Sequence, residues 1–448
     1  MTSRDPSCDV IIVGGGPAGM VLALLFARQG LSVTVLEAAR TFERSFRGDT
    51  LHPATLELMA QLGLAEDLLA LGHTRAHTAR YIGREKTMLL ADFALLRGEY
   101  PFLAIMSQSQ FLNFLYRQLL NYPQACVLFG ARVQSLCEDD ASPDGCTAQR
   151  KTGAQRNHRA QVTGVRYRQG DAEYRLTAPL TVGADGRHSK VRSLSGLNLK
   201  VLTPGQDVLW FSLPRHASDP HGSIDLHVGG GHCLVTTDHG ERWQVGFSLR
   251  KGSYADARKA GVDAVRQATA TILPWLGDRL GLLENWSQLR LLSVEVSRLK
   301  RWYRPGLLMI GDTAHVISPI GGLGINMAVQ DAVAAANRLT LPLQQGRLLT
   351  RDLAAVQRRR GWQIAVLQAQ QVVEERQVVN MTGEPEAVHL PMLLLRLVNR
   401  VPFLRRIPAY VTAYGLWPER LSHRWQAATV RPQERAGSRK EEQAEATA

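Results

Sequence analysis

The 448-residue sequence predicts an α/β fold in which a parallel-sheet domain carries an inserted antiparallel sheet and is followed by a helical C-terminal segment. Two glycine-rich turns, each between a short apolar run and a helical pattern, indicate the parallel sheet. Alternating runs at about 208–213, 223–228, 232–237 and 242–249 indicate the antiparallel sheet. Apolar residues at helical spacing over 351–380 indicate a long helix.

Composition limits the class of protein. Hydrophobic residues make up 45% of the chain, which is enough for a large core in two or three structural units. We expect neither a signal peptide nor a transmembrane span. The five cysteines lack close pairing and metal-ligand spacing, so we expect a cytoplasmic protein with reduced thiols and no metal site. The net charge of +13 indicates anionic partners, but the arginines are scattered without interleaved aromatic residues, which argues against nucleic acid.

The first glycine-rich turn lies in a Rossmann-like unit of strand, turn, helix and strand. Val10–Val13 is the first strand, and Gly14 permits the tight turn after it. Gly16 lets a pyrophosphate approach the backbone, and Gly19 lets the helix pack on the strand. The second strand leads to Glu37, whose carboxylate can accept hydrogen bonds from an adenosine ribose and disfavours a phosphorylated ribose. These elements in this order predict a dinucleotide-binding site.

The second glycine-rich turn follows a predicted buried strand at 307–310 and precedes a helix that should begin near Ile325. Gly322 and Gly324 leave room for a ligand beside the helix N-terminus, where unpaired N–H groups favour negative charge. Asp312 stands ahead of this turn. Its carboxylate would repel phosphate but would accept hydrogen bonds from a chain of hydroxyl groups, so we predict that a polyol binds here.

Other polar residues are candidates for the same site. Asp185 begins a turn after a predicted strand at 180–182, and Ser189 is placed to cap the next helix. Arg47 is placed to bind a pyrophosphate, although an ordinary surface arginine is an equal alternative. Gln108, in the first turn of a predicted helix, can bond to a polyol or serve in capping.

The first glycine-rich turn, the turn at Asp185 and the second glycine-rich turn follow one another in this order over roughly the first 345 residues. Together they resemble the class A flavoprotein monooxygenases, the family of para-hydroxybenzoate hydroxylase. The resemblance implies a discontinuous Rossmann-like FAD-binding domain of residues 1–75, 98–198 and 297–345. It also implies an inserted antiparallel-sheet substrate domain of residues 76–97 and 199–296.

The resemblance also implies which residues bind FAD. Asp312 would contact the ribityl chain, Val133 the adenine through its backbone, and Arg47 the pyrophosphate. Asp185 would contact both FAD and the nicotinamide cofactor. The full implied set is Gly14, Gly16, Pro17, Ala18, Gly19, Glu37, Arg47, Gln108, Val133, Asp185, Asp312, Pro319, Gly324, Ile325 and Asn326.

The flavin ring is implied to lie at the second glycine-rich turn. Pro319 would pack against the ring, and Gly324, Ile325 and Asn326 would present backbone N–H groups to its N1–C2 edge. A helix N-terminus at this edge would stabilise the negative charge of reduced flavin. Leu323 departs from the glutamine found in many relatives. A second glycine fingerprint for NAD(P)H is absent from the sequence, as is normal for this family.

The implied activity is hydroxylation of an aromatic, quinone-like or polyketide-like molecule. FAD reduced by NADPH or NADH would react with O2 to give a C4a-hydroperoxide, which transfers an oxygen atom. Alternatives on the same fold are a flavin-dependent halogenase and a lipid or isoprenoid reductase, and another class is a non-catalytic membrane-associated flavoprotein. The sequence assigns no catalytic residue. Five residues of the predicted sheet are candidates for lining a pocket, although sheet core or surface is favoured for each: Trp210, Phe211, His227, His232 and Trp243.

Residues 346–432 are predicted to form a C-terminal helical region, and residues 433–448 a disordered tail. Within residues 390–431, seven arginines alternate with apolar residues against one acid, Glu419. A helical cap with solvated arginines is the favoured interpretation. Peripheral contact with an anionic membrane surface is the alternative.

Overall fold

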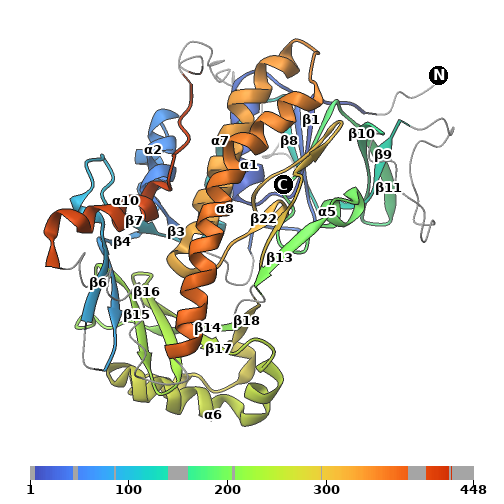
Figure 1. The fold of residues 1–448 in the computed structure, drawn as a ribbon. Coiled ribbons are helices and arrows are strands. Elements are labelled where there is room, and N and C mark those ends of the chain that lie inside the picture. The colour runs from blue at the N-terminus through green and yellow to red at the C-terminus, as the bar shows by residue number, and fades with distance from the viewer. Residues whose placement is uncertain are drawn as a thin grey trace, which may run out of the picture.

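The computed structural model describes residues 6–43, 49–84, 87–139, 160–203, 207–293, 295–381, 400–422 and 425. Arg47, the first ten residues of the 390–431 segment and the predicted tail therefore lie outside the described residues. Figure 1 shows a domain built on the parallel sheet, the long helix α8 running past it, and a second sheet with α6 on its far side.

A six-stranded sheet forms the centre of the first domain, in the order β20-β21-β12-β1-β2-β8. All neighbouring strands are parallel except β20 and β21. The strands are β1 Val10–Val13, β2 Val33–Glu37, β8 Ala125–Phe129, β12 Leu180–Gly183, β20 Tyr303–Arg304 and β21 Leu307–Met309. β1, β2, β12 and β21 are buried along their whole length, as expected of parallel strands covered on both faces.

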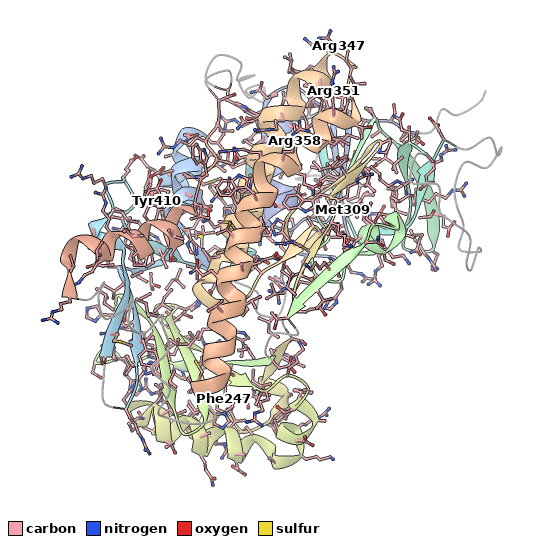
Figure 2. All side chains as sticks on the ribbon, in the orientation of Figure 1. Phe247, Met309, Arg347, Arg351, Arg358 and Tyr410 are labelled. Atoms are coloured by element: carbon pink, nitrogen blue, oxygen red, sulfur yellow. The ribbon has the colours of Figure 1, made fainter. Side chains whose placement is uncertain are left out.

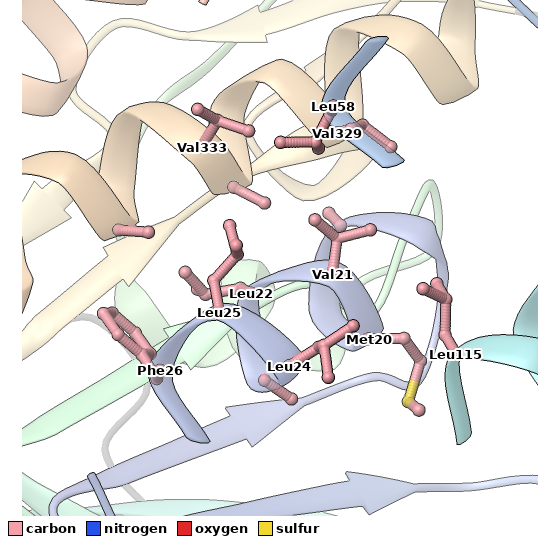
Figure 3. Packing of buried hydrophobic residues seen from close by; sticks show 14 of the residues in the cluster. Met20, Val21, Leu22, Leu24, Leu25, Phe26, Leu58, Leu115, Val329 and Val333 are labelled. Carbon is pink, nitrogen blue, oxygen red and sulfur yellow. The ribbon is translucent and has the colours of Figure 1, made fainter. Parts of the chain in front are cut away.

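Helices cover one face of this sheet. α1 (Pro17–Arg28) packs against α7 (Leu323–Gln344) and α4 (Gln108–Leu119), and the side chains of Val10 and Ile12 point into the same cluster. Figure 3 shows this packing, with Leu25 of α1 and Val333 of α7 on the facing sides of the two helices. Two short helices lie between α1 and α4 in the chain, α2 Pro53–Gln61 and α3 Ala65–Leu69.

The opposite face of the parallel sheet is covered by a three-stranded antiparallel sheet in the order β11-β10-β9. Its strands are β9 Arg132–Glu138, β10 Val162–Gln169 and β11 Ala172–Thr177. Ile11 and Val13, which alternate with Val10 and Ile12 along β1, pack into this second cluster. Helix α5 (Lys190–Ser195) closes the same side, and Ser189 caps it by accepting a hydrogen bond from the N–H of Arg192, as predicted.

The second large sheet has seven strands, in the order β18-β14-β17-β16-β15-β5-β6. They are β5 Thr78–Ile82, β6 Thr87–Asp92, β14 Asp207–Pro214, β15 Ser223–Gly229, β16 His232–Asp238, β17 Arg242–Leu249 and β18 Arg290–Ser293. The four predicted strands are confirmed. Their antiparallel pairing is confirmed as well. The sheet continues beyond them through β5, which arrives from an early part of the chain and runs parallel to β15.

Helix α6 (Tyr254–Ile272) is missing from the sequence-based description of this region. It packs against the face of the sheet that carries Phe211, Trp243 and Phe247. Figure 1 places α6 on the side of the sheet away from the first domain. Phe211 and Trp243, two of the candidate pocket residues, therefore belong to the core under α6. Trp210 points to the opposite face by strand alternation, and its ring lies against Gly246.

Two small sheets connect the large ones. One has the order β3-β7-β4, with β3 Thr50–Leu51, β4 Thr74–Ala76 and β7 Leu103–Ile105. The other has the order β13-β19-β22, with β13 Leu199–Thr203, β19 Val296–Leu299 and β22 His315–Val316.

The predicted long helix is α8 (Thr350–Met381), and it packs along α7 and β20. A shorter helix, α10 (Arg406–Tyr414), packs against β6 and α2. The Tyr414 hydroxyl donates a hydrogen bond of 2.7 Å to Glu57. None of the helices in the described ranges has the length and apolar character needed to cross a bilayer.

A buried ion pair ties the second sheet to the loop after α6. Asp219 accepts hydrogen bonds from both terminal nitrogens of Arg279, from the indole N–H of Trp243 at 2.8 Å and from the N–H of His216 at 2.9 Å. Burial alone would raise the pKa of Asp219, but these donors outweigh it and lower the pKa to about 2.

We predict that Asp219→Asn lowers the free energy of unfolding by about 2–4 kcal/mol at neutral pH, because Arg279 stays buried without its counterion. The wild-type protein should lose this contribution as the pH falls from about 4 towards about 2, because a carboxylate with a lowered pKa stabilises the fold only while it is ionised. Urea denaturation at several pH values measures both effects. Asp278→Asn is the matched control, since Asp278 binds the same arginine but is mostly exposed. Equal losses in the two variants would contradict the prediction.

Candidate functional site

The three predicted turns meet at one edge of the parallel sheet. In the sheet, Val13 lies beside Gly183, and Gly183 lies beside Met309, so β1, β12 and β21 end together. The turns that follow these strands begin at Gly14, Ala184 and Gly311. The carboxyl ends of parallel strands are where open α/β sheets bind their ligands. The structure thus brings three separate motifs into one candidate site.

Steric contacts explain the glycines of the first turn. A Cβ atom added to Gly14 would lie 2.4 Å from the carbonyl oxygen of Ala184, and φ at Gly14 is +106°. A Cβ atom added to Gly19 would lie 2.0 Å from the carbonyl oxygen of Gly14. Gly16 differs, because the nearest atom to its added Cβ is 4.0 Å away. Gly14 and Gly19 are needed by the fold, whereas Gly16 leaves open space in front of α1.

The N-terminus of α1 faces this space. Gly16 is the N-cap residue and Pro17 the first helical residue, so the N–H groups of Ala18 and Gly19 fall in the turn that lacks intrahelical acceptors. Glu37, at the end of β2, accepts hydrogen bonds of 2.8 Å from the N–H groups of Gly15 and Ala39. Glu37 therefore fixes the glycine turn, and its two carboxylate oxygens keep further lone pairs for a hydroxyl donor.

The turn at Asp185 and the turn at Asp312 are joined by hydrogen bonds. Asp185 accepts from the hydroxyls of Ser189 and Thr313 and from the N–H of Val191. The N–H of Gly186 donates to the Thr313 hydroxyl at 2.9 Å. The carboxylate of Asp185, predicted to touch the cofactors, is thus engaged with three protein donors. Its role in this structure is to hold the two turns together.

Asp312 lies at the surface of the joined turns with about a third of its side chain exposed. Its carboxylate accepts a hydrogen bond of 3.1 Å from Nε of Arg187. Arg192 donates to the carbonyl oxygens of Asp312 and Thr313, both at 3.1 Å. Nη1 of Arg187 is buried without an acceptor among the described residues. An unused donor beside an accessible carboxylate suits a ligand that carries hydroxyl groups.

The second glycine-rich turn leads into α7 through a short 3-10 helix, Ile320–Gly322. φ is +79° at Gly321 and +66° at Gly322, and a Cβ atom added to Gly324 would meet no atom within 4 Å. Helix α7 begins at Leu323 rather than near Ile325.

Because α7 begins at Leu323, the backbone N–H groups that are free to bind a ligand differ from the expected ones. Asn326 becomes the fourth residue of α7, where intrahelical hydrogen bonds begin, so the geometry favours the N–H groups of Gly324 and Ile325 over that of Asn326. The Asn326 side chain is fully buried, and its amide donates to the carbonyl oxygen of Ala413 at 3.4 Å. Asn326 therefore links α7 to α10. Pro319, predicted to face the flavin, is half-buried ahead of this turn.

A buried ionic cluster lies beneath the Asp312 turn. Asp331 of α7 contacts Nε2 of His315 at 2.6 Å and Nε of Arg360 at 2.9 Å, and it accepts the N–H of Gly311 at 3.0 Å. Asp331 and Arg360 are fully buried. Burial alone would raise the pKa of Asp331, but His315 and Arg360 outweigh it and hold the pKa below its usual value. The sequence-based predictions assigned no role to Asp331. A charged residue inside the alanine-rich pattern of this helix was the available signal.

The remaining predicted contacts lie on neighbouring elements. Gln108 is the first residue of α4, with Ser107 as its cap. Val133 lies in β9 and is buried close to Glu37, whose carbonyl oxygen accepts from the N–H of Ala131 at 2.9 Å. Arg47 stays a sequence-based prediction because it lies outside the described residues.

Two histidines connect this site to other parts of the chain. His52 is fully buried, with Nδ1 2.8 Å from the carbonyl oxygen of Thr412 and Nε2 3.1 Å from that of Gly322. Burial lowers the pKa of His52 to about 4, so the ring is neutral and structural at pH 7. His239, in the turn after β16, pairs with Asp49 and brings the seven-stranded sheet against the loop before β3. The His239 contact had no signal in the sequence.

The residues present fit FAD. The open space at Gly16 in front of α1 suits a pyrophosphate, and Asp312 with Arg187 suits a hydroxyl-bearing chain. The N-terminus of α7 provides a further position that favours negative charge. All three lie along one edge of the sheet, in the order that an extended dinucleotide requires.

Comparison with known proteins agrees with this geometry. The profile of a protein family described as "FAD binding domain" matches residues 7–367. The chain is 33% identical over 409 residues to a 6-methylpretetramide 4-monooxygenase from Streptomyces rimosus, covering 91% of this chain and 92% of that protein.

Solved structures share the fold. The p-nitrophenol 4-monooxygenase of Pseudomonas putida DLL-E4 superposes with a TM-score of 0.72 at 19% identity, covering 90% of this chain and 97% of that one. A flavin-dependent brominase superposes with a TM-score of 0.69 at 17% identity, covering 92% and 96%.

We predict that Asp331→Asn lowers the free energy of unfolding by about 3–5 kcal/mol, because the buried guanidinium of Arg360 loses its counterion. Urea denaturation of the FAD-free protein measures the change without a contribution from cofactor binding. The double variant Asp331→Asn/Arg360→Met should regain part of this loss, since it removes both charges. A loss below about 1 kcal/mol in the single variant would show that the cluster is not the anchor described above.

Proposed function

This chain belongs to the class A flavoprotein monooxygenases, and we propose that it hydroxylates an aromatic or polyketide-like small molecule with FAD, NAD(P)H and O2. As a member of this family it is an FAD-dependent monooxygenase. The observation that carries the proposal is the meeting of the three motif turns at one edge of the parallel sheet, where the Asp185 turn and the Asp312 turn are bonded directly through Asp185 and Thr313. The name of the curated relative, a 6-methylpretetramide 4-monooxygenase, supports the substrate class.

The proposed binding roles follow from the geometry of each turn. The N–H groups at the start of α1 and the space at Gly16 hold the pyrophosphate, and Glu37 accepts from the adenosine ribose. Asp312 accepts from the ribityl hydroxyls, with Arg187 holding its carboxylate in place. Gly324 and Ile325 direct N–H groups to the flavin ring, where a helix N-terminus favours negative charge. Bound FAD supplies the redox chemistry with NAD(P)H and O2.

We place the substrate between this edge and the face of the seven-stranded sheet that α6 leaves free. Residues that point to this face by strand alternation include Trp210, Ser212 and Gln244, and the Ser212 hydroxyl donates to the Gln244 amide oxygen at 2.7 Å. The His239–Asp49 pair brings the sheet against the first domain beside this space. A closed, water-poor site protects reactive oxygen chemistry from hydrolysis, which gives the sheet a role beyond binding.

The proposed reductant is NADPH or NADH, which would dock without a Rossmann domain of its own. This proposal rests on the family, because the three turns are accounted for by FAD. The halogenase alternative is weaker, since the brominase superposes at only 17% identity and so indicates the fold alone. The lipid reductase and the non-catalytic flavoprotein have no particular support in the geometry.

The function is tested by spectroscopy of the purified protein. We expect flavin absorption bands that bleach on anaerobic addition of NADPH or NADH and return with air. A substrate-dependent increase in oxygen uptake, with a hydroxylated product seen by mass spectrometry, would establish the activity. A protein that cannot be reconstituted with FAD would overturn the cofactor proposal. Chloride- or bromide-dependent products in place of hydroxylated ones would favour the halogenase.

Gly16→Ala separates cofactor binding from folding. Its added methyl group meets open space in the protein but would occupy the proposed pyrophosphate position, so we expect FAD affinity to fall about tenfold or more with little change in stability. Gly281→Ala is the matched control, because its Cβ also meets open space but lies in the second sheet region. Fluorescence titration of FAD into the FAD-free variants measures the affinity. Unchanged affinity in Gly16→Ala would place the pyrophosphate elsewhere.

We further propose that the C-terminal segment contacts an anionic membrane surface from one side. Within its described part, Ile407 is 56% exposed, Tyr410 41% and Trp417 58%, while Ala409 and Ala413 face the core. Figure 2 shows Tyr410 on α10, at the edge of the molecule. Neighbouring arginines at 400, 405, 406 and 420 supply the positive charge.

Ile407→Ser/Trp417→Ser should therefore weaken co-sedimentation with vesicles that contain phosphatidylglycerol by about tenfold. Leu282→Ser/Val201→Ser is the matched control, since these residues are 53% and 51% exposed on other elements. If the two double variants sediment equally, or if wild-type protein does not bind the vesicles, the segment is a solvated helical cap.

A further inference from the structure

A second candidate site lies away from the sheet edge that carries the three motifs. A cleft of about 800 Å³ is lined by residues of α8, of β13, and of the segment from β19 to β20. It falls within the usual size range of small-molecule sites. Its described lining consists of Lys200, Arg298, Leu299, Lys300, Arg301, Trp302, Tyr303, Ala354, Gln357, Arg358, Gly361, Trp362 and Ala365.

The charge of this cleft is one-sided. Five of its lining residues are basic, and none of those described is acidic. Lys200 of β13 lies directly opposite Arg298 of β19 in the antiparallel pair, an arrangement in which like charges repel. Arg358 faces them from α8, and Figure 2 shows it on that helix below Arg351. Such a gathering of cations is stabilised when an anion binds between them.

Aromatic rings lie beside the basic groups. Trp362 is 47% exposed on α8 and lines the cleft, which leaves one face of a large ring system available. Trp302 is buried beneath the cleft, and the guanidinium of Arg301 lies 5.6 Å from the centre of the Tyr303 ring. An exposed indole next to cations suits a flat heteroaromatic base linked to phosphate.

Gly361 keeps the cleft open. It lies in the interior of α8, where glycine is less favourable than alanine. An added Cβ would lie 3.5 Å from Gln357 and 4.0 Å from Trp302, which are ordinary contacts, so the protein's own packing does not require glycine here. The missing side chain leaves space between Arg358 and Trp362 along the helix. Close approach of a ligand is a physical reason for glycine at this position.

We propose that this cleft binds a phosphorylated nucleotide, with its phosphates among the five basic residues and its base on Trp362. The phosphates would relieve the repulsion between Lys200 and Arg298. Two kinds of molecule carry both a base and phosphates: NADPH, used as the reductant, and a free nucleotide that acts as an effector. The proposal does not depend on the FAD site, because the cleft shares none of the residues assigned to that cofactor.

Isothermal titration of the FAD-loaded full chain with ATP, NADPH and pyrophosphate tests this. We expect binding that weakens with salt and that Lys300→Gln/Arg358→Gln reduces about tenfold or more. The matched control is Lys259→Gln/Arg351→Gln, which removes the same charge from exposed positions outside the lining. Trp362→Leu should weaken ATP and NADPH but leave pyrophosphate unchanged, because only the nucleotides carry a base.

The pattern of binding identifies the source. Competition between ATP and NADPH, lost together in the cleft variant, assigns the site to the reductant, whereas ATP that binds without competing with NADPH but changes the rate of NADPH oxidation assigns it to an effector. The proposal is wrong if none of the three probes binds at millimolar concentration. It is also wrong if the cleft variant binds them as tightly as the control variant does.

Discussion

The buried carboxylate of Asp331 is the constraint on which the cofactor edge depends. A fully buried carboxylate is tolerated only when its oxygens are satisfied, and here the partners come from two separate segments: the N–H of Gly311 and His315 from the Asp312 turn, and Arg360 from α8. Because Gly311 immediately precedes Asp312, the cluster fixes where the Asp312 carboxylate can lie. The same contacts hold α8 against α7 through Arg360. The contacts that pack α8 against α7 therefore also position Asp312, the residue proposed to bind the ribityl chain of FAD.

The other two turns reach the same edge through backbone contacts and short polar side chains. Gly14 approaches Ala184 so closely that any Cβ would collide with its carbonyl oxygen, and Thr313 bonds to both Asp185 and Gly186. None of these contacts uses a side chain larger than threonine or aspartate. Because glycine and short polar residues are needed at fixed positions, the edge leaves a clear pattern in the sequence. This explains why the cofactor could be predicted from the sequence alone.

What could not be predicted involves side chains that meet only after folding. The strands and the glycine turns were found within a few residues, since they follow from local pattern and steric demand. Helix α6 was missed because its apolar face is weak, with only Val265 and Thr269 fully buried along its length. The partners of Asp331 and the pairing of His239 with Asp49 join distant segments, so no local pattern reveals them. Strand alternation places Trp210 and Trp243 on opposite faces of the sheet, but the sequence does not say which face is covered. The position of α6 settles this, because it covers the face that carries Trp243.

The structure also shows where some of the basic residues behind the net charge of +13 gather. Sequence alone indicates an anionic partner without saying where it binds. At the proposed FAD edge the two described arginines, Arg187 and Arg192, bind the Asp312 turn, and the proposed binding groups are mainly backbone N–H donors with Nη1 of Arg187 beside them. The cleft beside α8 gathers five cations with no described carboxylate among them. Because the potential of neighbouring charges adds, this face attracts anions more strongly than the scattered arginines do. Within the described residues, this cleft therefore concentrates positive charge at the place where we propose that a second anion binds.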